Sequence, residues 1–516
     1  MKRVNIIGSG LSGLYLAINL ARYNIESNLI SQMPSERAQS ILACGGINAS
    51  LNTMGEDDNT ENHFNDTLKG GDFLEPEDNI RQLINNSVNV LNDLDKLGVP
   101  FERKNNKIML RNFGGQKKKR TAYAKSSTGK MIMTSLIDET RKYEVKGLIH
   151  RFNHHECIDV NIIKNEINYI IVKDLYNNKH YELKGSLVLA CGGLNGLFDK
   201  LTTGTSLNNS NIQSLLFMEG LEFKNLEFIQ FHPTTVDIKS KKLLISEAAR
   251  GEGGRLFIFD KNNNKYYFME DKYPELKNLM PRDVVSREEY LISIDNNYKH
   301  QIYLDLKDIK DEVWDNKLSD MREEVLEYLG IDPKYEYIPV EPGIHYFMGG
   351  INVDINHKTN INNIYSIGEA ASIYHGANRL GGNSMLGALV GAKVLANYLS
   401  KNSLLDYEIK EIEYEDLLDD KLLNIEITNI LKDSMSIVRD NKSLNDGLNK
   451  LDKLVFNQNN KLLIARINLA KAFILSALNR LESRGAHYRL DYNWKKEEYK
   501  KQTIAKYDKE ITIKFM

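Results

Sequence analysis

Histidine, arginine and glutamate residues that could bind anions or move protons gather between residues 222 and 350. They stand in four strings, Gln230-Phe231-His232-Pro233-Thr234, Ser246-Glu247-Ala248-Ala249-Arg250, Pro281-Arg282-Asp283 and His345-Tyr346-Phe347-Met348. An arginine offers a carboxylate a planar, bidentate fork that lysine cannot provide. Each residue alone also has a structural interpretation, since a histidine before proline fits a turn and an arginine fits an ion pair. The strings mark where chemistry would occur without naming the reaction.

A glycine-rich loop near the N-terminus has the spacing of a dinucleotide-binding turn. A β-type run at residues 4–7 enters a G-x-G-x-x-G string, a helix pattern leaves it, and a second apolar run follows at residues 27–31. Gly8 would make the tight turn, Gly10 would let the backbone approach a pyrophosphate, and Gly13 would let the helix pack on the strand. The free N–H groups of the helix would face the phosphates. The context predicts dinucleotide binding and leaves NAD and FAD open.

Two glycine pairs could meet the flat part of such a ligand. Gly45-Gly46 ends a polar loop, and only glycine would allow a ring system to lie so close to the backbone. A simple loop turn would also explain the glycine pair. A buried apolar run ends in Cys191-Gly192-Gly193, a second strand tip at which a cofactor could bind.

Hydrophobic periodicity predicts the elements that would position these residues. A helix is expected over residues 76–97 and another from residue 127 onward. Strands are expected over residues 146–190, and a separate α+β insertion with many charged turns over residues 255–340.

The strand and helix pattern then returns. A strand is expected at residues 363–369 and an apolar helix at 385–400, with Ser384 as its N-cap. Residues 405 to 484 follow a helical pattern, and a charged tail ends the chain. The basic run 117–120 is expected to be a solvated surface.

Composition narrows the function classes. The 516 residues are 41% hydrophobic and 27% charged with a net charge of −2, which is ordinary for a globular protein and predicts no nucleic-acid partner. We expect no apolar run long enough to span a bilayer and no signal peptide before the first strand. The cysteines, Cys44, Cys157 and Cys191, form no metal or haem motif, so we expect no metal site and a cytoplasmic location.

Taken together, the strings QFHPT, RGEGG, RDVVSR, HY-x-MGG, HGANRLGGNS and ESRGAH resemble the fumarate reductase/succinate dehydrogenase flavoprotein family, which also contains L-aspartate oxidase. The resemblance runs from residue 3 to about 490. It implies an α/β fold with a Rossmann-like FAD-binding domain at 1–232 and 346–402. An α+β capping domain would be inserted at 233–345, and a C-terminal helical domain with a tail would occupy 403–516.

The resemblance also implies roles for particular residues. Arg282 would be the proton donor or acceptor, and Glu247 and Arg250 would relay protons to it from solvent. The substrate, a small dicarboxylate, would be bound by His232, Ser246, His345, Arg379 and Phe113. The FAD contacts would come from Gly8, Gly10, Gly13, Ser31, Gly45, Gly46, Glu369 and Ser384. The string 482–489 would be structural, a helix end docked near the site.

Several positions depart from the family pattern. Gln39 stands where membrane-complex members carry the histidine that bonds covalently to FAD, so non-covalent FAD is expected. Cys44 and Cys191 replace a usual glutamine and threonine, and Ser126 replaces an aspartate. No acidic residue ends the second strand, where Ser31 occupies the ribose position, so FAD must be held by other contacts as well.

The residue type at position 113 differs between members of the family that act on different substrates. Members acting on fumarate or succinate have phenylalanine here, whereas L-aspartate oxidases have a glutamate suited to the substrate ammonium. The expected activity is therefore hydride transfer between flavin N5 and a C4 dicarboxylate, most simply fumarate reduction to succinate. L-aspartate oxidase, which forms iminoaspartate for NAD synthesis, and a catalytically silent flavoprotein remain as alternatives. An iron–sulfur subunit or another electron donor is the expected partner.

Overall fold

The fold starts from a parallel sheet in the N-terminal half. A computed structural model of the protein describes residues 2–113, 115–125, 127–239, 241–417, 419–456 and 458–516, so Ser126 lies outside the described residues. The parallel strands are β1 (Arg3–Ile7), β2 (Glu26–Ser31), β8 (Ile149–Asn153), β12 (Ser186–Leu189) and β21 (Ile364–Ser366). Their order is β21-β12-β1-β2-β8. Val4 and Ile6 of the central strand are fully buried, as expected for a sheet covered on both faces.

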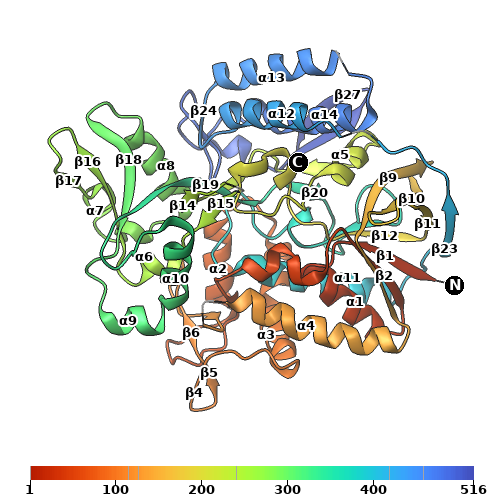
Figure 1. Cartoon of the computed structure of the whole chain (residues 1–516), viewed down its shortest axis with the longest axis horizontal. Coiled ribbons are helices and arrows are strands. Elements are labelled where there is room, and N and C mark those ends of the chain that lie inside the picture. The colour runs from red at the N-terminus through yellow and green to blue at the C-terminus, as the bar shows by residue number, and fades with distance from the viewer. Residues whose placement is uncertain (1, 114, 126, 240, 418, 457) are drawn as a thin grey trace.

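Helices cover one face of this sheet. They are α1 (Leu11–Arg22), α4 (Thr128–Val145) and α11 (Asn383–Leu399), and α1 packs against both α4 and α11 (Figure 1). A further helix, α3 (Glu77–Lys96), packs against α11. The expected helices at 76–97 and from 127 are confirmed. The expectation that Ser384 caps α11 is wrong, because Gly382, with a φ of +80°, occupies the cap position and Asn383 already begins the helix.

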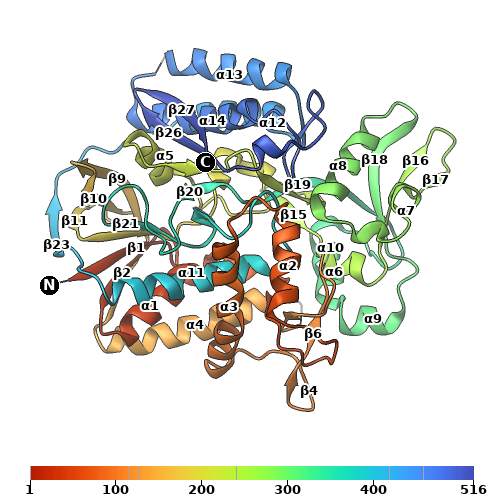
Figure 2. The same cartoon turned by 180° about the vertical axis from the view of Figure 1, so that it is seen from behind.

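An antiparallel sheet with strand order β23-β11-β10-β9 lies beside the parallel one (Figure 2). Its strands are β9 (His155–Ile163), β10 (Glu166–Asp174), β11 (His180–Lys184) and β23 (Glu408–Ile412). The strands expected over residues 146–190 are confirmed. The helical expectation is wrong at β23, where alternating residues pair with β11 and Glu408 forms an ion pair with Lys184 across the sheet.

The inserted cap is built on two long strands. Antiparallel β14 (Ile229–Asp237) and β19 (Ile338–Phe347) run from the domain of the parallel sheet into the cap, where the sheet continues as β18 (Tyr298–Asp305), β16 (Arg255–Asp260) and β17 (Lys265–Tyr266). The edge strand is β15 (Lys242–Leu244), and the helices are α6 (Glu247–Gly251), α7 (Phe268–Lys272), α8 (Arg282–Ser293), α9 (Asp311–Asn316) and α10 (Ser319–Leu329). The cap has its own hydrophobic core around the buried Trp314 and stands apart from the rest (Figure 1).

The C-terminal region contains three packed helices and ends in a hairpin. It contains α12 (Lys421–Ser434), α13 (Asn441–Phe456) and α14 (Lys461–Asn479), and α14 packs on α13 and on α5 (Asn211–Met218). By length and composition alone α14 could cross a membrane, but most of it is buried inside the protein, so it is only weak evidence for a span. The tail is a hairpin of β26 (Thr503–Asp508) and β27 (Glu510–Phe515) that extends a sheet with β13 (Phe223–Lys224), a pairing with residues far away in sequence.

The basic run at 117–120 is not entirely a solvated surface. Lys117 is exposed, but Arg120 is fully buried and its Nη2 lies 3.0 Å from Asp58 Oδ1 and 2.9 Å from Asp66 Oδ2. A buried guanidinium needs such carboxylates because isolated charge is costly to desolvate. The lysines that precede Arg120 in the sequence do not indicate that it is buried.

A buried ion-pair network joins the C-terminal region to the domain of the parallel sheet. Arg480 Nε donates to Glu227 Oε1 at 2.6 Å and Arg480 Nη1 donates to Glu482 Oε1 at 2.9 Å. Arg484 donates to both oxygens of Glu482, at 2.7 Å and 3.0 Å. The backbone N–H of Ala486 then donates to the carbonyl of Ala377 at 3.0 Å. The string 482–489 therefore supports the loop that carries Arg379.

Replacing Glu482 with glutamine is expected to lower the free energy of unfolding by about 3 kcal/mol or more, because two buried arginines lose their shared counter-charge. Urea unfolding followed by circular dichroism would measure it. The matched control is Glu498→Gln in the same segment, where the side chain is 71% exposed and a change below about 0.5 kcal/mol is expected. Equal midpoints for the two variants would contradict the structural role of the network.

Candidate active site and cofactor cavity

One cavity of about 690 Å³ extends from the glycine loop after β1 to the cap, within the range of ligand sites. Seven of the eight predicted cofactor residues line it, namely Gly8, Gly10, Ser31, Gly45, Gly46, Glu369 and Ser384. Gly13 is outside the lining. A Cβ on Gly13 would lie 2.0 Å from the carbonyl oxygen of Gly8, so this glycine serves the close packing of α1 on the loop.

The loop at residues 8–13 fits a dinucleotide. Gly8 has a φ of +112°, and a Cβ there would lie 2.2 Å from the carbonyl oxygen of Ala190, so only glycine allows this turn. Gly10 has more room, because the nearest atom to its Cβ would be Ser40 Oγ at 3.4 Å. The loop therefore packs tightly on its sheet side and leaves the backbone at Gly10 open to the cavity.

The second glycine pair forms a flat wall. Gly46 has a φ of +150°, and a Cβ there would lie 2.6 Å from the carbonyl oxygen of Ala122. A Cβ on Gly45 would instead be 3.5 Å from the ring of Phe113. Arg111 Nη2 donates to the carbonyl oxygen of Gly45 and fixes this wall. Such a backbone offers a flat surface on which a planar ring system fits inside the cavity.

Four further residues that line the cavity carry polar or titratable groups, namely Gln39, Cys44, Cys191 and Glu369. Gln39 Nε2 donates to the carbonyl oxygen of Thr203 at 3.2 Å. Burial raises the pKa of Cys44 to about 11 and that of Cys191 to about 12, so both thiols are protonated at neutral pH. Burial also raises the pKa of Glu369 to about 7, while the backbone N–H of Phe347 donates to its Oε1 at 3.1 Å.

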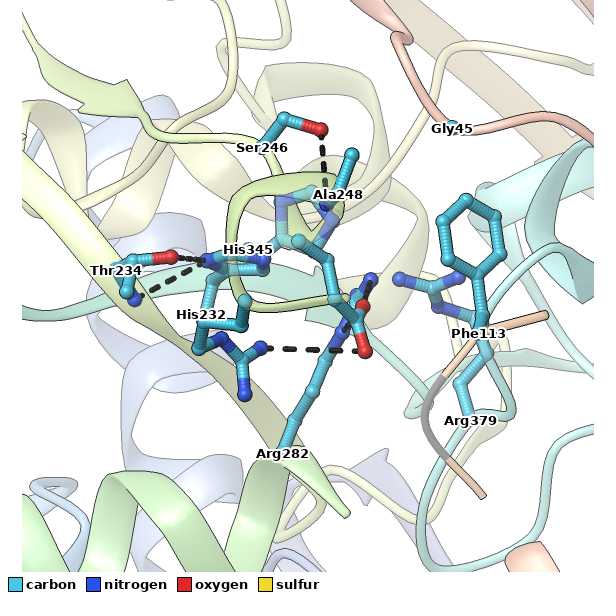
Figure 3. Close-up of polar contacts among 12 residues, drawn as sticks. Gly45, Phe113, His232, Thr234, Ser246, Ala248, Arg282, His345 and Arg379 are labelled. Atoms are coloured by element: carbon cyan, nitrogen blue, oxygen red, sulfur yellow. Dashed lines mark hydrogen bonds and ion pairs between the residues drawn. The ribbon is translucent and has the colours of Figure 1, made fainter. Parts of the chain in front are cut away.

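The cap end of the cavity collects the predicted substrate residues. His232 on β14 and His345 on β19 come from adjacent antiparallel strands, and their rings meet edge to face with centroids 5.3 Å apart. Ser246 and Glu247 begin α6, Arg282 begins α8, and Arg379 and Phe113 come from loops. Figure 3 shows the ends of Arg282 and Arg379 side by side, with the two histidine rings on one side and Phe113 on the other.

An ion pair sets the direction of Arg282. Its Nε and Nη2 both donate to Glu247 Oε2, at 2.9 Å and 2.5 Å. Its Nη1 donates to Gln230 Oε1 at 3.2 Å, and Arg379 Nη2 donates to the same oxygen at 2.8 Å. Gln230 is completely buried and thus aligns both guanidinium groups. Our sequence analysis missed it, although its place two residues before His232 on one strand was a signal.

Both histidines are neutral in this arrangement. Burial, followed by the charge of Arg282, holds the pKa of His232 and of His345 well below the usual 6.5. The backbone N–H of Thr234 donates to His232 Nδ1 at 3.3 Å, which leaves the ring proton on Nε2. His345 Nδ1 is 2.9 Å from Thr203 Oγ1, a second contact that the sequence analysis did not single out.

Arg250 lies behind this site and does not line the cavity. It is 2% exposed, its Nη1 donates to the carbonyl oxygen of Asn278 at 2.7 Å, and its Nη2 is 3.9 Å from Glu247 Oε1. Glu247 thus lies between the two arginines, but its contact with Arg250 is an ion pair and not a hydrogen bond, so the relay stays a prediction. In this conformation Arg250 itself does not reach the surface.

Comparison with known proteins agrees with this geometry. Residues 3–385 match the family described as FAD binding domain, and residues 462–516 match the one described as fumarate reductase flavoprotein C-term. The chain is 32% identical to the succinate dehydrogenase flavoprotein subunit of Bacillus subtilis (strain 168), over 97% of this chain and 93% of that protein. It is 34% identical to L-aspartate oxidase of Clostridium perfringens (strain 13 / Type A), over 81% of this chain and 92% of that protein.

A solved structure extends the similarity to three dimensions. The E. coli quinol fumarate reductase chain superposes with a TM-score of 0.86 at 25% identity, covering 100% of this chain and 97% of that one. The matched domains and the flavoprotein relatives identify FAD as the cofactor of the cavity. The bend of the backbone at Gly8 and the flat wall at Gly45 and Gly46 fit its pyrophosphate and its ring system.

Precipitating the purified protein with trichloroacetic acid is expected to release all of its FAD, because a glutamine at position 39 cannot form the covalent bond. The absorbance of the supernatant at the flavin band, compared with the total flavin of the sample, measures the released fraction. Flavin fluorescence that stays with the denatured polypeptide on a gel would disprove the expectation.

Proposed function

Because the chain belongs to the fumarate reductase/succinate dehydrogenase flavoprotein family, we propose that it interconverts fumarate and succinate and acts mainly as a fumarate reductase. It is a flavoprotein oxidoreductase of this type. The observation that carries the finer proposal is the position of Arg282 in the cavity, where it is paired with Glu247 and lies next to Arg379 and two neutral histidines.

The residues around the cavity suit a dicarboxylate. Arg379 would bind one carboxylate in bidentate fashion, and its Cζ lies 4.4 Å from the ring centroid of Tyr346, which supports the guanidinium. His232 and His345 would donate hydrogen bonds from adjacent strands to a carboxylate, with Ser246 close by. These donors also withdraw electron density from the double bond between the carboxylates.

Bound FAD supplies a hydride from its reduced ring to one carbon of the double bond. Arg282 would give a proton to the other carbon, so that fumarate gains one hydride and one proton and becomes succinate. An arginine is a weak acid, with a usual pKa of about 12.5 or higher, and it must be reprotonated at once. Glu247 accepts both inward N–H groups of Arg282 and is placed to return that proton.

Phe113 supports an unsubstituted substrate over L-aspartate. Its ring lies against Gly45 at the cavity wall and carries no charge that could pair with a substrate ammonium. L-aspartate oxidase remains the second candidate, because the Clostridium perfringens protein of that name matches most of this chain. Gln39 supports reduction over succinate oxidation, since the covalent flavin bond that raises the potential in this family cannot form.

A second protein would complete the electron route. Relatives from Bacillus subtilis and Haemophilus influenzae are named flavoprotein subunits, and this chain too would receive electrons from a partner such as an iron–sulfur subunit. The cytoplasm is the proposed compartment, supported by the unpaired state of Cys44, Cys157 and Cys191.

Dithionite-reduced enzyme is expected to recover its oxidised flavin spectrum when fumarate is added without oxygen. Oxidised enzyme mixed with L-aspartate without oxygen is expected to show no bleaching, because Phe113 cannot pair with the ammonium. Stopped-flow absorbance records both reactions. Bleaching by aspartate without reoxidation by fumarate would show instead that the protein is an aspartate oxidase, and no response to either would favour a silent flavoprotein.

Replacing Arg282 with glutamine is expected to slow fumarate-driven reoxidation by about 100-fold or more, the usual range for a lost general acid. The matched control is Arg287→Gln on the same helix, whose guanidinium lies 5.0 Å from the ring of Tyr488 and outside the cavity. The control should retain the normal rate. A similar loss in both variants, or none in Arg282→Gln, would remove Arg282 from the mechanism.

A further inference from the structure

The place where a dinucleotide fold usually binds ribose lacks an acid in this chain. In such folds an acidic residue at the end of the second strand accepts hydrogen bonds from the ribose hydroxyls. Here β2 ends at Ser31, which lines the cavity, and its Oγ donates to the carbonyl oxygen of Met33 at 2.9 Å. The Ser31 hydroxyl group already donates its proton within its own turn, and it carries no negative charge.

A carboxylate from a neighbouring strand reaches the same part of the cavity. Ser31 pairs with Asn153, the last residue of β8, and the chain then enters β9, where Glu156 is the second residue. Glu156 lines the cavity together with Ser31, Cys191 and Asn208. This end lies beyond the pyrophosphate loop at Gly10 and away from the wall at Gly45 where the flavin ring fits. It is the end that the adenosine half of FAD would occupy.

Hydrogen bonds hold Glu156 in place through one carboxylate oxygen, and the other oxygen can still accept hydrogen bonds from a ligand. Asn209 Nδ2 donates to its Oε1 at 2.5 Å, and Asn211 Nδ2 is 3.5 Å from the same oxygen. Within the described part of the chain, Oε2 of Glu156 makes no hydrogen bond. It is also not one of the fully buried polar atoms that lack a partner, so it is accessible from the cavity. The charged groups that act on the carboxylate are Lys173, which pairs with Glu156 across the sheet, and Asp419.

We propose that Glu156 binds the ribose hydroxyls of the adenosine half of FAD and replaces the missing acid at the end of β2. A carboxylate oxygen oriented by two asparagines can accept hydrogen bonds from both hydroxyls of a ribose. The carboxylate comes from β9 and not from β2, so the motif spacing of dinucleotide folds does not reveal it. This site concerns the cofactor and does not depend on which dicarboxylate the enzyme uses.

The test compares FAD with its analogue that lacks the ribose 2′-hydroxyl group of the adenosine. The holoenzyme is incubated with a large excess of both flavins until exchange is complete. The bound flavins are then released with acid and quantified by chromatography. The ratio gives the relative affinity directly, without preparing a flavin-free protein and without any turnover of substrate.

The wild-type enzyme is expected to prefer FAD by about 10-fold, the effect of one hydrogen bond to a charged acceptor. Glu156→Gln keeps the oxygen that Asn209 contacts but loses the charge, and its preference should fall to about 2-fold or less. The matched control is Asp159→Asn on the same strand, whose Oδ1 lies 2.7 Å from Lys461 Nζ, and it should keep the wild-type ratio.

Two results would overturn the proposal. One is a wild-type enzyme that binds both flavins equally, because the protein would then make no measurable hydrogen bond to the ribose 2′-hydroxyl group. The other is an unchanged preference in Glu156→Gln, which would mean that the residue only supports the loop around Asn209. Either result would leave the fumarate assay unaffected, so failure here is separable from failure of the proposed reaction.

Discussion

The site depends on positive charge that is buried with too few negative partners. Arg250, Arg282 and Arg379 are all largely removed from water, and Glu247 forms ion pairs with Arg250 and Arg282. Burial raises the pKa of the two other carboxyl groups that act on these arginines, Glu289 at Arg250 and Glu369 at Arg379, so they carry less negative charge. Burying such charge is costly unless it is paired. In the proposed reaction, a substrate with two carboxylates would supply the missing negative charge, so the cavity is expected to bind a dianion in preference to neutral molecules.

Burial and, after it, the nearby positive charge account for the state of the histidines. A dry environment and the guanidinium of Arg282 both disfavour imidazolium, so His232 and His345 are neutral. Their opposite nitrogens are occupied by Thr234 and Thr203, which fixes the rings. Gln230 has a related role, because one carboxamide oxygen holds two like-charged groups in fixed positions.

The architecture distributes these groups over parts of the chain that are far apart. Strands β14 and β19 bring the histidines from the FAD-binding domain toward the cap, and α6 and α8 add the ion pair. The loop of Arg379 rests on the C-terminal region, where Ala486 bonds to Ala377 and Arg480, Glu482 and Arg484 form a buried network. The position of Arg379 therefore depends on a region whose described residues contribute no side chain to the cavity.

The sequence by itself determined the elements and the residue types. Glycine spacing at Gly8 and Gly10, helical periodicity and the rare strings around His232 and Arg282 are local patterns, and local patterns are set by backbone sterics and the side on which apolar residues fall. Tertiary structure alone decided the rest. Gln230 meets Arg379 across 149 positions, the tail pairs with β13, Arg120 is buried although its neighbours are not, and Glu156 reaches a place that β2 leaves without an acid. Such contacts depend on burial and charge pairing between distant segments, which no spacing along the chain encodes.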